Sequence, residues 1–351
     1  MSDHVPTSTE RPQEPVEPPA ADAPETPEHV APVTEPGSGK WALYASKYGL
    51  LGAFLLSILI FSLVRPDSFP TGRNAESILT LAAPSLIMAV GLTVVLVMQD
   101  FDLSFGAMIG LAGGAGEAFM VQYGWPWQVA VLAVIGLGVL AGMSNGFMVA
   151  FLGGSSFIIT LAMGTVLTGV EYALTNQNTV YQGFPQTFVD IASNDFLGLS
   201  NQIWIGAVIA ILIWILLDRT EIGRYMYAIG GNPEAARLSG VRVVPLRMLG
   251  FVIVGVTAAI VGLLLISQSG SYAPNGGTSY LLPTYAAVFL GAAVFRPGEF
   301  NVPGTIIGVL FLGVIQTGLI MLDLQTYVIN LVQGGILITA VLISRLGARA
   351  A

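Results

Sequence analysis

The sequence predicts an all-α fold, a polytopic transmembrane helix bundle of about ten spans with both termini cytoplasmic. Three observations indicate this fold class. The 351 residues are 54% apolar and only 10% charged, a composition outside the range of soluble domains. The apolar residues gather in runs of roughly 20, the length that crosses a ~30 Å hydrocarbon core. Lysine and arginine concentrate in alternate connecting segments.

Ten apolar runs fit the length of a membrane-spanning helix. They are 48–64, 77–98, 103–121, 127–152, 156–174, 202–217, 248–267, 280–295, 303–322 and 326–343. We expect kinked or broken helices among them. Pro84 removes a backbone donor within the second run, and the short run 280–295 contains Pro283, which favours a broken or tilted span.

The distribution of positive charge supports an even number of spans with the N-terminus inside, because cytoplasmic segments carry an excess of Lys and Arg. In that topology only Arg65 and Arg73 are external. The cytoplasmic basic residues are Arg11, Lys40, Lys47, Arg219, Arg224, Arg237, Arg242, Arg247, Arg296, Arg345 and Arg349. The main cytoplasmic loop is then 218–247, and the main external stretches are 175–201 and 268–281.

Residues 1–40 form a tail that differs in composition from the membrane region, residues 41–351. Its first 39 residues hold nine of the twenty prolines and eight acidic side chains against the single Arg11. Such a segment has too few apolar groups to offset its ordering entropy, so we expect a disordered cytoplasmic tail. A solvating extension is the interpretation we favour, and binding of a cytoplasmic partner is the alternative.

The residue types of the membrane region exclude most enzyme chemistry. The chain has no cysteine, its two histidines (His4 and His29) lie in the tail, and no lysine follows Lys47. Thiol nucleophiles, Cys/His zinc sites and histidine bases are therefore absent from residues 41–351. Asp100 and Asp102 are too close along the chain to form a carboxylate dyad. We expect no catalytic residue, no metal site and no bound cofactor in this chain, and an intramembrane enzyme is the least favoured function.

Glycines recur every four residues in three of the predicted spans. The stripes are Gly106, Gly110 and Gly114; Gly138, Gly142 and Gly146; and Gly304 and Gly308. Small residues at this spacing let helix backbones approach closely where lipid provides no hydrophobic drive for association. The stripes predict a tightly packed bundle.

The second half of the loop 218–247 predicts a short, well-delimited helix. Asn232 is a good N-cap, Pro233 suits the first helical position, Glu234 suits the first turn, and Gly240 suits the end. Two interpretations are open. The helix is either a rigid knob that docks into a soluble partner or an ordinary helix on the lipid surface.

Two sequence motifs resemble those of ribose-type ABC sugar-importer permeases. The first is Gly223-Arg224 followed by Ala228-Ile-Gly-Gly-Asn-Pro-Glu-Ala-Ala-Arg-Leu-Ser-Gly240, which is similar to the cytoplasmic-loop signature of that family. The second is Asp102-Leu103-Ser104-Phe105-Gly106, which resembles the family's Gly-Ile-Asp-Leu-Ser-Val-Gly with Phe101 on its glycine-isoleucine side. The resemblance extends over about residues 50–345. The segment 290–298 departs from the family pattern, so the resemblance indicates the class and not the particular sugar.

The resemblance implies a non-catalytic permease subunit in the bacterial plasma (inner) membrane. Its partners would be cytoplasmic ATP-binding subunits that carry ATP and Mg²⁺, an extracytoplasmic sugar-binding protein, and a second permease copy or homologue, with no role for nucleic acid. The substrate would be a monosaccharide, meaning a pentose, a hexose or a related polyol. By the same resemblance, the coupling helix to the ATPase comprises Asn232, Pro233, Glu234, Ala235, Ala236, Arg237, Leu238, Ser239 and Gly240.

Several polar residues in the predicted spans are candidates for the substrate pathway, because neutral hydrogen-bonding groups suit an uncharged polyhydroxy solute. They are Asp102, Ser104, Glu117, Asn145, Ser156, Thr160 and Glu171. For Asp102 we favour a capping role at the start of the third span over direct substrate contact. Glu117 and Glu171 fall near the predicted outer ends of their spans, where water can reach them. Helix packing is an equal alternative for both.

A second class of function, ion-coupled secondary transport, would use Glu117 and Glu171 as proton or sodium sites. The sequence places both acids near one membrane face, whereas coupled sites gather near the bilayer midplane. ATP-driven import is therefore the favoured hypothesis.

Overall fold

The computed structural model of the chain describes residues 40–296 and 298–350. Its long helices in chain order are α1 (Lys40–Val64), α2 (Gly72–Val97), α3 (Phe105–Glu117), α4 (Trp127–Gly146), α5 (Ser156–Thr175), α7 (Asn201–Arg219), α10 (Val243–Ser269), α11 (Leu281–Gly291), α12 (Val302–Met321) and α13 (Thr326–Ala350). Residues 1–39 of the predicted disordered tail lie outside the described residues.

Short elements connect the long helices. They are the π-helical turns η1 (Ala118–Gln122) and η2 (Phe147–Phe151), the helices α6 (Gln186–Ser193), α8 (Glu221–Gly231) and α9 (Pro233–Leu238), the strands β1 (Asp195–Phe196) and β2 (Leu199–Ser200), and the 3₁₀ turn η3 (Thr278–Tyr280). The two strands pair antiparallel. The predicted all-α class is therefore confirmed, with one two-stranded hairpin among the described residues.

Within the part of the chain that the structure describes, six helices are long and apolar enough to cross a membrane. They are Gly72–Val97, Trp127–Phe151, Ser156–Thr175, Asn201–Arg219, Val243–Ser269 and Val302–Met321. The predicted run 280–295 contains α11, whose 11 residues rise only about 16 Å, less than the hydrocarbon thickness. Helix α2 continues through Pro84. The count of ten spans and the kink at Pro84 stay predictions.

The loop after α7 contains two helices, and the sequence predicted only the one in its second half, which is confirmed. Helix α9 begins and ends where Asn232 and Gly240 predicted. Helix α8 was not predicted, because it begins one residue after the end of α7, with Thr220 alone between the two helices. The Thr220 hydroxyl accepts a hydrogen bond from Gly223 N at 3.2 Å and caps α8.

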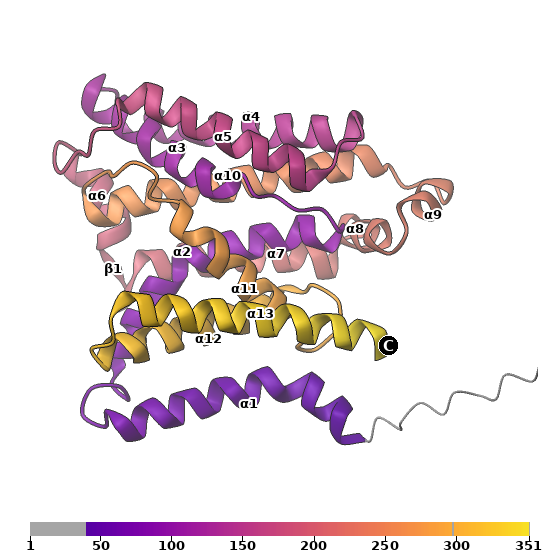
Figure 1. Cartoon of the computed structure of the whole chain (residues 1–351). Helices are drawn as coiled ribbons and strands as arrows, with labels where there is room; N and C mark the ends of the chain where they lie inside the picture. Colours follow the sequence, from indigo (N-terminus) through magenta and orange to yellow (C-terminus); the bar gives the residue numbers. More distant parts are fainter. Residues whose placement is uncertain (1–39, 297, 351) are drawn as a thin grey trace, which may run out of the picture. The chain divides into compact units, whose positions relative to one another are not determined.

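Helices α2 and α10 form the centre of the described helices (Figure 1). In the most apolar window of each, 72% of the α2 residues and 67% of the α10 residues are buried, against 17% for α5. Helix α2 contacts α7, α10, α11 and α12, while α10 also contacts α3, α4 and α6. The peripheral helices expose apolar side chains such as Ile158 and Leu161 on α5. Outward-facing apolar surface of this kind suits a lipid environment.

Two of the three glycine stripes lie where helix backbones touch, which confirms the predicted close packing there, whereas Gly110 and Gly114 of the α3 stripe face side chains of α5. On α4, a Cβ at Gly142 would collide with the backbone carbonyl of Phe251, and one at Gly146 would lie 2.8 Å from the Cα of Met248. On α12, a Cβ at Gly304 or Gly308 would collide with backbone carbonyls of α11. Only glycine allows these helix pairs to approach so closely.

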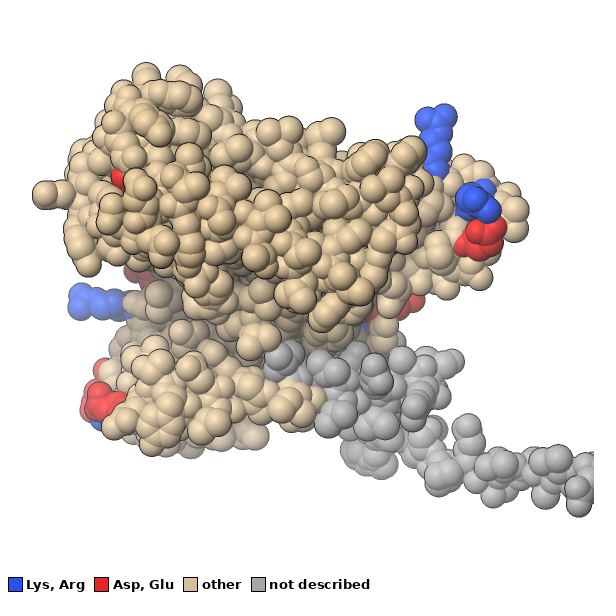
Figure 2. Space-filling view, turned by 45° about the horizontal axis from the view of Figure 1, so that its top comes forward, with Lys and Arg blue, Asp and Glu red and all other residues tan. Residues whose placement is uncertain are grey.

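The connecting segments gather at the two ends of the helices. Helix α6 and β1 lie at one end, and α8, α9 and the end of α13 lie at the other (Figure 1). We call these the α6 end and the α9 end. In the view of Figure 2, charged side chains gather toward the two ends and leave a broad uncharged surface between them. This is the charge distribution of a protein whose middle lies in hydrocarbon.

Candidate functional site

The chain leaves the helical conformation between α2 and α3. After α2, Gln99 adopts a positive φ of 62°, while its N–H and that of Asp100 return to the carbonyls of Leu96 and Val95 at 2.9 and 3.0 Å. These bonds close the end of α2. We refer to residues 98–104, from the end of α2 to the start of α3, as the α2–α3 junction.

Asp102 holds the start of α3 within this junction. One oxygen of its carboxylate, Oδ1, accepts the backbone N–H of Ser104 at 2.8 Å and the Ser104 hydroxyl at 2.6 Å. The side chain of Asp102 is buried. A carboxylate that accepts a free N–H group at a helix start has the favourable electrostatics expected from the helix dipole. This geometry agrees with the capping role favoured from the sequence.

Three other predicted pathway residues converge on the same junction. Asn145 of α4 donates to the Ser104 hydroxyl at 2.8 Å and to the second Asp102 oxygen at 3.4 Å. From α5, Ser156 accepts the N–H of Phe101 at 3.1 Å, and Thr160 accepts the N–H of Leu103 at 3.0 Å. Five of the seven sequence candidates, Asp102, Ser104, Asn145, Ser156 and Thr160, therefore form one hydrogen-bonded cluster.

Tyr285 of α11 completes the cluster and was missed in the sequence. Its hydroxyl accepts the N–H of Asp102 at 3.1 Å and donates to the carbonyl of Asp102 at 2.8 Å. Its ring lies against Phe101 and Phe105, with centroid distances of 6.4 and 6.0 Å. The residue stands in an apolar run 183 positions after Asp102, and no local pattern links the two.

A bidentate ion pair ties the junction to α10. The guanidinium of Arg247 donates to the two carboxylate oxygens of Asp100 at 2.7 and 2.6 Å. The side chain of Asp100 is 4% exposed and that of Arg247 is 25% exposed. This pair was also missed, because the sequence indicated Arg247 only as one of several loop arginines.

Glu171 and Glu117 occupy the other end of the bundle and do not join the cluster. Their exposed fractions are 0% and 1%, so the expectation that water reaches them is wrong. Segments beyond the spans fold over them. Glu117 accepts a hydrogen bond from Gln122 of η1 at 2.8 Å. One oxygen of Glu171, Oε1, accepts the hydroxyl of Tyr272 and the N–H of Asn275, each at 2.8 Å.

The residues bonded to Glu171 belong to the 271–280 segment, which connects α10 to α11. Its residue Tyr272 forms an antiparallel bridge with Val180, with N–O distances of 2.7 and 2.9 Å. The two segments that the sequence marked as external, 175–201 and 268–281, thus meet at the α6 end. Ser267 of α10 strengthens this contact by donating to the carbonyl of Phe188 in α6 at 2.7 Å.

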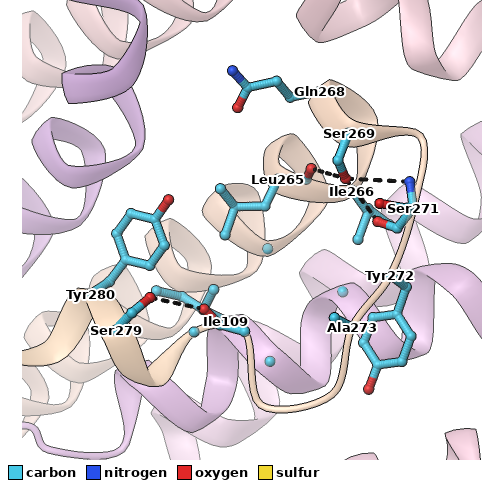
Figure 3. A pocket seen from close by; sticks show the side chains of 15 residues that line it. Ile109, Leu265, Ile266, Gln268, Ser269, Ser271, Tyr272, Ala273, Ser279 and Tyr280 are labelled. Carbon is cyan, nitrogen blue, oxygen red and sulfur yellow. Dashed lines mark hydrogen bonds between the residues drawn. The ribbon is translucent and has the colours of Figure 1, made fainter. Parts of the chain in front are cut away.

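A cavity of about 350 Å³ lies between α3, α10 and the 271–280 segment. Its lining residues are Ile109, Gly110, Gly113, Gly262, Leu265, Ile266, Gln268, Ser269, Ser271, Tyr272, Ala273, Gly276, Gly277, Ser279 and Tyr280. Figure 3 shows Gln268 and Tyr280, from different elements, among the side chains that line the cavity. The lining combines aromatic rings, hydroxyls and an amide without a charged side chain, which suits a neutral polyhydroxy ligand.

Helix α9 projects from the long helices at the α9 end, and its start and end are well defined. The Asn232 side chain accepts the N–H groups of Glu234 and Ala235, each at 3.0 Å, and Gly240 ends the turn with a φ of 88°. Leu238 is 81% exposed. The arrangement presents a capped helix with an apolar side chain exposed to solvent.

Helix α8 fixes α9 to the rest of the chain. A Cβ at Gly230 of α8 would collide with the carbonyl of Val97, the last residue of α2. Tyr227 donates its hydroxyl to the carbonyl of Phe300 at 3.0 Å. Burial, with a smaller contribution from the nearby Asp218 carboxylate, raises the pKa of Tyr227 to about 12, so this donor stays protonated at neutral pH. Helix α9 is thus connected through α8 to the α2–α3 junction.

Among the described residues, six membrane-capable helices, packed closely at glycine and joined by buried polar bonds, define a polytopic membrane protein. The chain belongs to the family described as branched-chain amino acid transport system / permease component, whose model matches residues 74–341.

Three relatives illustrate the range of this similarity. The chain is 34% identical over 294 residues to the ribose import permease protein of Escherichia coli (strain K12), an alignment that covers 83% of this chain and 91% of that protein. It is 29% identical over 306 residues to the D-allose transport system permease protein of the same organism, covering 87% and 94%. It is 30% identical over 354 residues to a xylose transport system permease protein of Haemophilus influenzae, covering 84% and 94%.

Proposed function

We propose that this chain is the membrane permease subunit of an ATP-driven ABC importer that translocates a monosaccharide. The three relatives described above are named for ribose, D-allose and xylose, which are two pentoses and a hexose. A pentose, a hexose or a related polyol is therefore the substrate class. The observation that carries the proposal is helix α9, a capped and exposed arm whose sequence resembles the cytoplasmic-loop signature of ribose-type permeases.

Helix α9 is the coupling helix in this account. Residues Asn232 to Gly240 dock into cytoplasmic ATP-binding subunits, which bind ATP and Mg²⁺ in place of this chain. The exposed side chain of Leu238 and the Glu234–Arg237 ion pair at 2.6 Å present a defined surface to that partner. Because α8 seats α9 against the end of α2, movement of the arm reaches the α2–α3 junction directly.

We further propose ten spans with both termini in the cytoplasm of a bacterium and the bundle in its plasma membrane. The end of α13 lies at the α9 end, together with the arginine-rich loop (Figure 1). The α6 end is then the outer end. There the bridged segments 175–201 and 268–281 would receive a sugar-loaded binding protein, and a second permease copy or homologue would complete the passage.

The candidate pathway residues divide into two groups in this proposal. Asp102, Ser104, Asn145, Ser156 and Thr160 hold the junction through bonds to one another and to backbone groups, so they shape the inner part of the pathway. Glu117 and Glu171 are buried at the outer end and shape the entrance. An ion-coupled transporter is the alternative, because two buried acids are the residues such a protein would use.

The coupling role of α9 is tested by two variants of its cap. Asn232→Ala removes the acceptor of two backbone N–H groups, a loss worth ~1 kcal/mol to the helix, whereas Asn232→Asp keeps an acceptor. In a reconstituted complex with its ATP-binding and sugar-binding subunits, we expect Asn232→Ala to weaken the stimulation of ATP hydrolysis by sugar-loaded binding protein. Asn232→Asp should retain it.

Charge reversal at Arg237 provides a stronger perturbation of the same surface. Arg237→Glu replaces the partner of Glu234 with a like charge and should uncouple or disassemble the complex. A complex that assembles and couples normally with both Asn232→Ala and Arg237→Glu would exclude α9 as the coupling helix.

A further inference from the structure

Glu171 is a buried carboxylate whose bonds join two distant parts of the chain. Its Oε1 accepts bonds from Tyr272 and Asn275, which follow it by 101 and 104 residues. Neither donor belongs to a long helix, since both lie in the 271–280 segment. Asn275 has a positive φ of 60°, and its N–H group points at the carboxylate. A side chain within the bundle therefore determines where a connecting segment lies.

The 271–280 segment, which is bonded to Glu171, packs closely against α3. A Cβ at Gly277 would collide with the carbonyl of Gly106 and would lie 2.6 Å from the Cβ of Ile109. Tyr272 is only 2% exposed although it belongs to a connecting segment. The segment covers Ile109, which is itself 1% exposed. Lifting the segment from α3 would expose this side chain.

The same segment is one wall of the cavity in Figure 3. It supplies Ser271, Tyr272, Ser279 and Tyr280, while α3 and α10 supply the facing walls. Glu171 does not line the cavity, yet its bonds to Tyr272 and Asn275 set the position of that wall. This separates a role in shaping the entrance from a role in contacting the solute.

Gly110 of α3 provides the space that the carboxylate occupies. A Cβ at Gly110 would lie 2.6 Å from Oε2 of Glu171 and 3.1 Å from its Cδ. Oε2 is buried and has no hydrogen-bond partner among the described residues, so the 271–280 segment holds the carboxylate through Oε1 alone. An added methyl group at position 110 would displace the carboxylate without changing its chemistry.

We propose that Glu171 is a positioning residue: by accepting bonds from Tyr272 and Asn275, it holds the 271–280 segment against α3 and so fixes the outer cavity through which a monosaccharide enters. The inference rests on the proposed function for the identity of the solute and the direction of entry. It assigns Glu171 the role of a hydrogen-bond acceptor. Its negative charge is not required, which distinguishes this role from that of an ion-coupling site.

The test uses the natural absence of cysteine from the chain. Ile109→Cys places a single thiol beneath the segment, and its reaction with a membrane-impermeant maleimide is followed in proteoliposomes that contain the assembled importer. Four second changes are compared: Glu171→Ala, Glu171→Gln, Gly110→Ala and Tyr272→Phe. Gly169→Ala on α5 is the matched glycine control, because a Cβ there meets no atom within 4 Å.

Glu171→Ala and Gly110→Ala should speed labelling of the thiol at position 109 roughly tenfold, because local opening becomes easier when both bonds are lost or displaced. Tyr272→Phe removes one donor without emptying the site, so it should give a smaller increase and remain informative if the alanine variants do not assemble. Glu171→Gln keeps an acceptor oxygen and should stay close to the parent rate, as should Gly169→Ala.

A second single thiol, introduced by Ala192→Cys in α6, reports general loosening. Ala192 is 1% exposed, and its N–H bonds to Ser267 of α10, outside the 271–280 segment, so this thiol should label slowly in every variant.

Equal labelling at position 109 in the parent, Glu171→Ala and Tyr272→Phe would overturn the inference. Equally fast labelling in Glu171→Gln and Glu171→Ala would also overturn it, because charge would then be the required property. Failure of the parent complex to take up any sugar would contradict the proposed function and leave the labelling comparison intact.

Discussion

The α2–α3 junction depends on single hydrogen-bonding groups that come from helices far apart in the sequence. The backbone of Asp102 has both its N–H and its carbonyl bonded to the Tyr285 hydroxyl. Its side chain is shared between Ser104 and Asn145. Buried groups of this kind are costly when a partner is removed, so each side chain is expected to matter on its own.

Tyr285→Phe should lower the stability of the folded chain by ~1–3 kcal/mol, because two buried backbone groups lose their partner while the ring remains. The midpoint of thermal unfolding of the purified protein in detergent measures the loss. Tyr181→Phe is the matched control, since the Tyr181 side chain is 79% exposed. An equal unfolding midpoint for the two variants would contradict a stabilising role of the Tyr285 hydroxyl in the junction.

The Asp100–Arg247 pair gives a second expectation for single residues. Arg247→Met should destabilise the chain by about 3 kcal/mol, because it leaves the 4%-exposed Asp100 carboxylate without its partner. Adding Asp100→Asn should recover much of the loss, since the buried charge is then gone. The same unfolding midpoint reports both effects, and a double variant as unstable as the single one would show that the pair is not coupled.

The sequence identified the polar members of the junction but not the contacts that assemble them. Asp102, Ser104, Asn145, Ser156 and Thr160 were recognisable as polar groups inside apolar runs, and the Asp102 capping role follows from local chemistry. Tyr285 and Arg247 were not recognisable, because a tyrosine in an apolar run and an arginine at a loop end have many ordinary explanations. Long-range partners become visible only once the helices are placed.

Backbone contact at glycine lets two helix pairs approach closely. The α4 stripe lies on the α10 backbone, and the α12 stripe lies on α11. Four-residue spacing predicted these two contacts without naming the partner helix, whereas the α3 stripe, with the same spacing, faces side chains of α5. Helix α6 was not predicted, because it is only eight residues long, half of them polar, and only Phe188 and Ala192 are buried.

Substitution of two glycines in α4 separates packing from helix propensity. Gly142→Ala should destabilise the chain by ~1–3 kcal/mol, since its Cβ would collide with the Phe251 carbonyl. Gly136→Ala on the same helix meets no atom within 4 Å and should be neutral or stabilising by up to ~1 kcal/mol. Yields of folded protein and unfolding midpoints compare the two. A Gly142→Ala variant as stable as Gly136→Ala would contradict the close α4–α10 contact.

The two ends of the molecule differ in structure. The α9 end carries the proposed coupling helix on an arginine-rich loop, and the α6 end carries the bridged segments around the cavity. The positive-inside pattern predicts which end is cytoplasmic, whereas the contact between segments 175–201 and 268–281 has no signature in the sequence.

The orientation of the ends is open to a direct check with two single-cysteine variants. Ser239→Cys marks the α9 end and Asn178→Cys marks the α6 end, and both positions are exposed. In intact cells, an impermeant maleimide should label the Asn178→Cys variant at once. It should label the Ser239→Cys variant only after the membrane is opened. Labelling of the Ser239→Cys variant in intact cells, and of the Asn178→Cys variant only after opening, would show the opposite topology.

The most direct test of the account is the energy source for uptake. The chain is reconstituted with its ATP-binding subunits, and a sugar-loaded binding protein is added on the α6 side. Uptake of a monosaccharide should then require ATP inside the proteoliposome and should persist when all ion gradients are collapsed. Uptake by this chain alone, driven by a proton or sodium gradient and abolished by Glu171→Gln, would contradict the account and establish an ion-coupled transporter.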